Sequence, residues 1–289
     1  MERIRPLWRM PGIVLRERSH PPGRERIPEP MVMDNPESVA QFHTGGASNP
    51  GIRAVYDLCA RALDVLLPPG GHLLDLGVGS GRALSAALRR RPDVQVTAVD
   101  LAPNMLSAAR ELLDAEGLGE RVELLQADIT ALPERISTGP WDAISCMWTL
   151  HQLPDFDYLR GALSQIAAIQ RRSAAAVWIS DFQRLRDPTA GTNMLLIVDP
   201  ASPAVLRQDA IASEAAAFTI AELSKELAAA GLQGMHCGHS TPLPYLQAHW
   251  MFGARGKMNA LRGTRDGQLD RRARRESALL RWGFTAKPF

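Results

Sequence analysis

The stretch Gly71–Asp100, GHLLDLGVGSGRALSAALRRRPDVQVTAVD, decides the fold of this chain. An apolar run at Leu73-Leu74 leads into the turn Asp75-Leu76-Gly77-Val78-Gly79-Ser80-Gly81, and a helical apolar pattern follows. Pro92-Asp93 interrupts that pattern, and alternating apolar residues then lead to Asp100. A strand–helix–strand unit with parallel strands requires roughly thirty residues. The stretch therefore predicts a strand, a glycine turn, a helix and a second strand.

The glycines of this turn predict a ligand site. Glycine adopts positive φ at little cost, and it lets a ligand approach the backbone closely. The free N–H groups at the start of the following helix face the same ligand. Asp100, at the end of the second strand, is placed to bind the two hydroxyls of a ribose.

The spacing Asp75-x-Gly77-x-Gly79-x-Gly81 differs from the dinucleotide pattern G-x-G-x-x-G. It resembles motif I of the class I S-adenosylmethionine (SAM) dependent methyltransferases. The resemblance implies that Asp75 holds the ammonium group of SAM, that the three glycines lie against its methionine portion, and that Asp100 binds its ribose. It also implies a Rossmann-like, doubly wound α/β sheet of seven strands, mostly parallel with the last strand antiparallel, and helices on both faces.

Later segments resemble further motifs of the same family. Asp128, after the third strand, is implied to accept a hydrogen bond from the adenine amino group, for which a carboxylate is chemically apt. The resemblance adds residues that pack around the adenine or border SAM, namely Leu101, Met105, Ala127, Ile129, Cys146 and Met147. SAM is therefore the expected cofactor, and S-adenosylhomocysteine (SAH) is the expected product.

The segment after the fourth strand, Trp148-Thr149-Leu150-His151, is the expected place of the reaction. Open α/β sheets bind ligands at the carboxyl edge of their strands. The pKa of histidine lies near neutrality, so His151 is a candidate general base, with a structural role as the alternative. His43, before the first strand, is a second catalytic candidate. Further side chains are candidates to contact the substrate, namely Tyr56, Trp148, Asp181 and Asn193.

Composition divides the chain into three parts. Residues 1–33 are rich in proline and arginine and are predicted to form a disordered basic arm. Residues 34–253 are the expected methyltransferase domain, with an insertion at 183–218 on the substrate side. Residues 254–289 form a basic C-terminal extension, in which a helix over 268–282 is expected and a solvated tail is the alternative.

The 289 residues are 45% hydrophobic and carry a formal net charge of +2, as in an ordinary globular protein. No apolar run approaches the ~18 residues of a membrane span, and the N-terminus shows no secretory signal. The three cysteines lie far apart, so a reducing cytoplasm is the expected compartment. The expected partner is a small-molecule methyl acceptor, and a homodimer is left open.

Several acceptor classes are disfavoured by motifs that the chain lacks. Catechol-type methyltransferases hold a divalent metal with acids at the ends of the fourth and fifth strands. Here the fourth strand has no acid at its end, and Asp181 is followed by Phe182 instead of Asn, so no metal is expected. The chain lacks the [D/N]-P-P-[Y/F] motif of the nucleic-acid enzymes that methylate amino groups. It also lacks the Pro-Cys nucleophile of the cytosine-5 enzymes. An O-, N-, S- or C-methyltransferase acting on a small molecule is the favoured hypothesis. Three alternatives stay open: a nucleic-acid methyltransferase that uses the arginine-rich ends, an arsenite-type thiol-dependent enzyme, and a non-catalytic SAM-binding protein.

Overall fold

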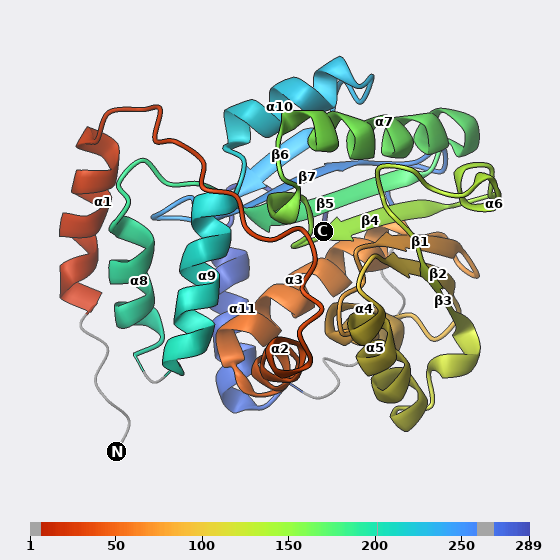
Figure 1. Ribbon diagram of the computed structural model, residues 1–289, viewed down its shortest axis with the longest axis horizontal. Coiled ribbons are helices and arrows are strands. Elements are labelled where there is room, and N and C mark those ends of the chain that lie inside the picture. The colour runs from red at the N-terminus through yellow and green to blue at the C-terminus, as the bar shows by residue number, and fades with distance from the viewer. Residues whose placement is uncertain (1–6, 201, 259–268) are drawn as a thin grey trace.

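Seven strands form one sheet in the computed structural model, which describes residues 7–200, 202–258 and 269–289 (Figure 1). The sheet has the order β3-β2-β1-β4-β5-β7-β6. The first five strands are parallel, and β7 pairs antiparallel with both β5 and β6. This confirms the predicted doubly wound sheet with an antiparallel last strand. The strands are β1 (His72–Leu76), β2 (Gln95–Asp100), β3 (Val122–Gln126), β4 (Ala143–Met147), β5 (Ala176–Phe182), β6 (His236–His239) and β7 (Leu246–Met251).

Helices cover both faces of the sheet (Figure 1). Successive side chains of a strand point to opposite faces, so Leu73 and Leu74 of β1 belong to two different hydrophobic clusters. The α-helices are α1 (Met10–Ser19), α2 (Pro36–Ser48), α3 (Pro50–Leu66), α4 (Arg82–Arg90), α5 (Pro103–Ala115), α6 (Glu134–Ser137), α7 (Phe156–Ser173), α8 (Ala190–Val198), α9 (Ala204–Ala216), α10 (Ile220–Ala229) and α11 (Arg271–Trp282). The described residues also form the short 3₁₀ turns η1 (Leu7–Arg9), η2 (Gly119–Arg121) and η3 (Leu150–Gln152). None of the described helices is long and apolar enough to cross a membrane.

The parallel register brings the carboxyl ends of β1, β2, β4 and β5 to one edge of the sheet. Asp75 of β1 lies opposite Ser145 of β4, and Met147 of β4 lies opposite Ser180 of β5. The loops that follow these strands therefore meet at one place. This edge is where open α/β sheets bind ligands.

The N-terminal segment differs from the predicted disordered arm. Met10–Ser19 forms α1, which packs beside α8 and buries Ile13 (Figure 1). The Glu17 carboxylate accepts hydrogen bonds from the backbone N–H groups of Arg186 and Asp187, at 2.9 and 2.8 Å. The described residues 7–33 therefore do not form the disordered arm that composition predicts, because contacts of this kind tie the segment to the insertion. Residues 1–6 lie outside the described part of the chain.

The C-terminal segment also packs on the domain. The expected helix over 268–282 is present as α11, although residues 259–268 lie outside the described part of the chain. Ala273 and Ser277 of α11 are buried against α3. Asp57 of α3 accepts hydrogen bonds from the Ser277 hydroxyl and the Arg281 guanidinium. A solvated tail is therefore not what residues 269–289 form.

Candidate functional site

The glycine turn between β1 and α4 has the left-handed backbone that its sequence predicts. Gly77, Gly79 and Gly81 have φ of 76°, 52° and 77°. A Cβ on Gly77 would lie 2.2 Å from Thr149 Oγ1, so a larger residue does not fit there. The backbone N–H groups of Gly77 and Val78 donate to the carbonyl of Val99, at 2.8 and 3.0 Å. The turn is thereby fixed against the end of β2.

Three carboxylates surround this turn. Asp75 accepts a hydrogen bond from the Ser145 hydroxyl at 2.5 Å. Asp100 accepts from the backbone N–H groups of Gly79 and Ala102, at 2.7 and 2.9 Å. Asp128 accepts from both the N–H and the hydroxyl of Thr130, at 2.8 Å. Asp75 thus lies near the end of β1, Asp100 is the last residue of β2, and Asp128 follows β3.

Burial changes the acidity of two of these groups. It raises the pKa of Asp75 to about 6, because the ionised carboxylate loses its hydration there. Burial also raises the pKa of Asp100, although hydrogen bonds from backbone N–H groups oppose the shift. A cationic ligand group beside Asp75 would stabilise its ionised form.

A cavity of about 1940 Å³ opens at this edge of the sheet. Most of the predicted cofactor residues line it, namely Asp75, Gly77, Gly79, Asp100, Leu101, Met105, Ala127, Asp128, Ile129 and Met147. Gly81 and Cys146 do not line it. Gly81 begins α4 against Ala109, and Cys146 is buried in the core below the sheet.

The sequence analysis missed Ser80, which also lines the cavity. Within the described part of the chain, the buried Ser80 hydroxyl has no hydrogen-bond partner. A buried hydroxyl without a partner is costly, and a polar ligand would satisfy it. Its place in the glycine turn was the only signal in the sequence.

His151 and Asp181 form a buried pair beside the cavity. His151 Nδ1 lies 2.6 Å from Asp181 Oδ1, and the His151 backbone N–H donates to the other carboxylate oxygen at 3.0 Å. Asp181 also accepts from the N–H of Phe182 at 2.7 Å. His151 lines the cavity and Asp181 does not, so Asp181 orients the histidine instead of contacting a substrate directly.

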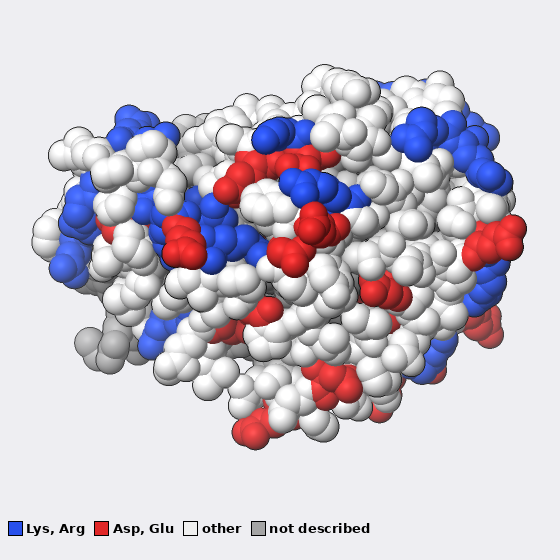
Figure 2. Space-filling view, turned by 45° about the horizontal axis from the view of Figure 1, so that its top comes forward, with Lys and Arg blue, Asp and Glu red and all other residues white. Residues whose placement is uncertain are grey.

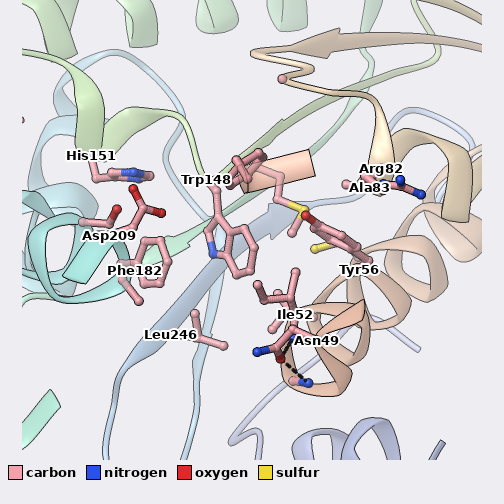
Figure 3. A pocket seen from close by; sticks show the side chains of 18 of the residues that line it. Asn49, Ile52, Tyr56, Arg82, Ala83, Trp148, His151, Phe182, Asp209 and Leu246 are labelled. Atoms are coloured by element: carbon pink, nitrogen blue, oxygen red, sulfur yellow. Dashed lines mark hydrogen bonds between the residues drawn. The ribbon is translucent and has the colours of Figure 1, made fainter. Parts of the chain in front are cut away.

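The charge environment of His151 is strongly acidic. Burial lowers the pKa of the imidazole, but the adjacent Asp181 carboxylate outweighs it, and the pKa of His151 is raised overall. Asp209 of α9 lies beside His151 in the cavity (Figure 3), and Glu29 of the N-terminal segment also interacts with it. Burial raises the pKa of both acids. Neither acid was predicted, since they come from segments far from the nucleotide motifs.

Aromatic rings form the wall next to His151. Trp148 has a left-handed φ of 50°, a strained backbone for a bulky residue. Its ring stacks on Phe182 with centroids 5.1 Å apart and lies 5.7 Å from the ring of Tyr56 (Figure 3). Phe182 in turn meets His151 edge-on at 5.2 Å. The predicted contacts Tyr56 and Trp148 line the cavity, and so does Phe182, which was not predicted.

Two predicted residues lie elsewhere. Arg82 donates to His43 Nε2 at 2.6 Å and to the His43 carbonyl at 3.2 Å, and His43 does not line the cavity. Burial lowers the pKa of His43, and the Arg82 charge lowers it further. Asn193 lies on α8 and is not among the described residues that line the cavity. The structure therefore does not bring His43 or Asn193 together with His151.

Arg26 ties the N-terminal segment to the His151 turn. Its guanidinium donates to the carbonyls of His151, Leu153 and Pro154, at 2.7, 2.5 and 2.6 Å. Its Nε donates to the carbonyl of Ala216, the last residue of α9, at 2.5 Å. The Arg26 side chain thus connects the turn that carries His151 to the end of the insertion at residues 183–218. Among the described residues, no cluster of His, Cys, Asp or Glu is arranged to hold a metal ion.

Residues 73–172 match the family model of a methyltransferase domain. A demethylmenaquinone methyltransferase from Thermus thermophilus is 33% identical over 109 residues, which make up 37% of this chain and 48% of that protein. The chain therefore spans about half the length of this curated relative.

Solved structures share the fold. The human N-acetylserotonin methyltransferase in complex with SAM is 16% identical to this chain. The structural alignment covers 86% of this chain and 68% of that protein, with a TM-score of 0.53. An O-methyltransferase family protein from Burkholderia thailandensis is 19% identical, with 88% and 68% covered at a TM-score of 0.52. At these identities the similarity shows the fold alone.

Proposed function

We propose that this chain transfers the methyl group of SAM to a hydroxyl oxygen of a small molecule. The match of residues 73–172 to the family model of a methyltransferase domain and the strand order of the sheet support this proposal. The observation that carries the proposal is the pairing of His151 with Asp181 at the wall of the cavity that the three carboxylates also line. The proposed cofactor site and a candidate base thus share one cavity.

The residues around the glycine turn fit SAM. Asp75 would hold the ammonium group, and the unpartnered Ser80 hydroxyl supplies a further polar contact to the methionine portion. Asp100, fixed by two backbone N–H groups, would bind the ribose hydroxyls. Asp128 would accept from the adenine amino group, because a carboxylate only accepts hydrogen bonds.

His151 serves as the base in this proposal. Bound SAM supplies an activated methyl carbon, so the protein must align the acceptor and remove its proton. As the C–O bond forms and the C–S bond breaks, the hydroxyl proton passes to His151 Nε2. Asp181, on the opposite ring nitrogen, stabilises the imidazolium that results.

A base of this kind favours an oxygen acceptor. A neutral amine already offers a lone pair, whereas a phenol has a pKa near 10 and a free alcohol a higher one. The aromatic walls at Trp148 and Phe182 support a small acceptor. Nucleic acid is less favoured, because Arg24 is paired with Glu214 and Arg26 is held by carbonyls. On the face shown in Figure 2, acidic side chains also lie among the basic ones.

Calorimetric titration with SAH tests the cofactor site. Asp100→Asn should weaken SAH binding at least tenfold, as the loss of charge-assisted bonds to a ribose predicts. Asp157→Asn, at a side chain 88% exposed on α7, is the matched control and should leave the affinity unchanged. Unchanged affinity in Asp100→Asn would remove the assignment. A screen of candidate phenols and alcohols with labelled SAM then tests for transfer.

A further inference from the structure

The cavity is much larger than a cofactor requires. Pockets for single ligands are usually about 300–1,000 Å³, whereas this cavity is about 1940 Å³. A second large molecule therefore fits beside SAM. Figure 3 shows that the space continues from His151 past Trp148 and Phe182 towards Ile52 and Asn49.

Many of the side chains that line the cavity beyond Trp148 are apolar, although polar ones such as Asn49 and Arg207 also line it. Its walls come from α3, α8, α9 and the turn before β7, all outside the matched region 73–172. The apolar side chains that line it include Ile52, Val55, Met194, Val198, Leu206 and Leu243. An acceptor that fills this part of the cavity is stabilised by the hydrophobic effect along its length. The stabilisation is about 25 cal/mol per Å² of apolar surface that becomes buried.

The far end of the same cavity is basic. Arg271, Arg272 and Arg275, in the first turns of α11, line it, and so do Leu279 and Leu280 further along that helix. Leu279 follows Arg275 by four residues, and Leu280 follows Arg271 by nine. At the helical rise the arginines therefore lie between about one and two and a half turns, or about 6 to 14 Å, from the leucines.

The leucines lie at the end of α11 that is nearer to the aromatic wall. The carbonyl of Gly283, just after α11, accepts a hydrogen bond from the backbone N–H of Thr241, in the turn before β7. Tyr245, at the end of that turn, meets Phe182 with ring centroids 5.6 Å apart, and Phe182 meets His151. The arginines adjoin the opposite region, because Arg272 pairs with Asp199 and Asp199 accepts from Asn49. Apolar lining thus separates the arginines from His151.

The arginines carry positive charge that the described chain does not neutralise. Arg272 Nη2 lies 3.8 Å from Asp199, a loose pair that is open to solvent. Arg271 and Arg275 form no ion pair with any residue of 7–200, 202–258 or 269–289. Glu276 also lines this end and offsets one charge. A ligand anion would still find an excess of guanidinium groups, which hold carboxylates and phosphates well.

We propose that the methyl acceptor is a long amphipathic anion. Its hydroxyl lies at His151, its apolar body follows the wall from Phe182 to Ile52, and its carboxylate or phosphate end lies at Arg271, Arg272 and Arg275. This inference rests on the proposed function, since it describes the acceptor of that reaction.

Calorimetry on the full chain with SAH present tests the inference without methyl transfer. Decanoate, decyl phosphate and decan-1-ol serve as probes that share an apolar chain and differ in the end group. The anions should bind at least tenfold more tightly than the alcohol, because one charge-assisted hydrogen bond exceeds the roughly 1.4 kcal/mol of a tenfold change. A preference for decanoate or for decyl phosphate identifies which anion the site suits, and either preference supports the proposal.

The triple variant Arg271→Gln, Arg272→Gln, Arg275→Gln should bring the affinities for anion and alcohol to within about twofold of each other, while SAH binding stays unchanged. Arg274→Gln is the matched control, since Arg274 lies on the same helix and does not line the cavity. Equal binding of decanoate and decan-1-ol by the unmodified chain would overturn the inference, and so would an equal loss in Arg274→Gln. If the unmodified chain does not bind SAH, the result would instead count against the proposed function.

Discussion

His151 Nδ1 lies 2.6 Å from Asp181 Oδ1, and both side chains are only 4% exposed. Since a carboxylate only accepts hydrogen bonds, Nδ1 carries the proton and Nε2 is left as the acceptor. The backbone N–H groups of His151 and Phe182 hold the same carboxylate. The ring is therefore fixed in the tautomer that a general base requires.

Replacement of His151 should separate chemistry from cofactor binding. We expect His151→Ala to lower kcat about 10²–10⁴-fold, the usual contribution of a general base, with no change in the Kd of SAH. Steady-state kinetics and calorimetry measure the two quantities. His20→Ala, at an exposed histidine after α1, is the control and should keep full activity. Equal kcat in both variants would assign His151 a structural role.

The pH profile should report the raised pKa of His151. The base form is required, so kcat/KM should rise with pH, and the midpoint should lie above the ordinary histidine value of about 6.5. In Asp181→Asn the anion that favours the imidazolium is lost and burial still opposes charge, so the midpoint should fall. The maximal rate should fall as well. A midpoint that stays in place in Asp181→Asn would contradict the role of this pair.

Cofactor binding should have its own pH dependence, set by Asp75. Burial raises the pKa of this carboxyl to about 6, and only the ionised form attracts an ammonium group. The affinity for SAH should therefore be greatest between about pH 7 and the pKa of the SAH ammonium group, and it should fall towards tenfold per pH unit below pH 6. Calorimetry across this range measures it. Asp75→Asn should bind weakly with no such slope, and a slope that persists in this variant would place the titrating group elsewhere.

The fold and the geometry of the glycine turn could be predicted because their signals are local. The glycines at 77, 79 and 81 need positive φ, and the acids Asp75 and Asp100 stand at fixed distances from them. Thr219 and Glu222, three positions apart, likewise form a capping box at the start of α10. In each case the residues that act together lie within one turn or one strand–helix–strand unit.

The remaining parts of the site depend on contacts between distant segments. Composition indicated disorder for the N-terminal segment, yet Arg24 meets Glu214 across 190 positions of sequence. Asp209 and Phe182 carry no motif, and only the packing of the insertion brings Asp209 to His151. His43 stood at a suitable place in the sequence, but Arg82 occupies its Nε2. Single-sequence patterns do not encode such pairings.

Arg26 provides a prediction for the N-terminal segment. Four carbonyl oxygens, those of His151, Leu153, Pro154 and Ala216, accept from its planar guanidinium. A lysine keeps the charge but cannot reach four acceptors with a fixed geometry. Arg26→Lys should therefore loosen the turn that carries His151 and lower kcat about tenfold, a loss of roughly 1.4 kcal/mol of barrier stabilisation.

The readouts for Arg26→Lys distinguish positioning from a general loss of structure. The Kd of SAH should stay unchanged, because the glycine turn and its carboxylates lie apart from Arg26, while the pH midpoint of kcat/KM should shift with the displaced His151. Arg18→Lys, at an exposed position of α1, is the matched control and should match the unmodified chain. If SAH binding and kcat fall together in Arg26→Lys, the guanidinium stabilises the whole domain. An unchanged kcat would instead show that His151 holds its place without this clamp, through Asp181 alone.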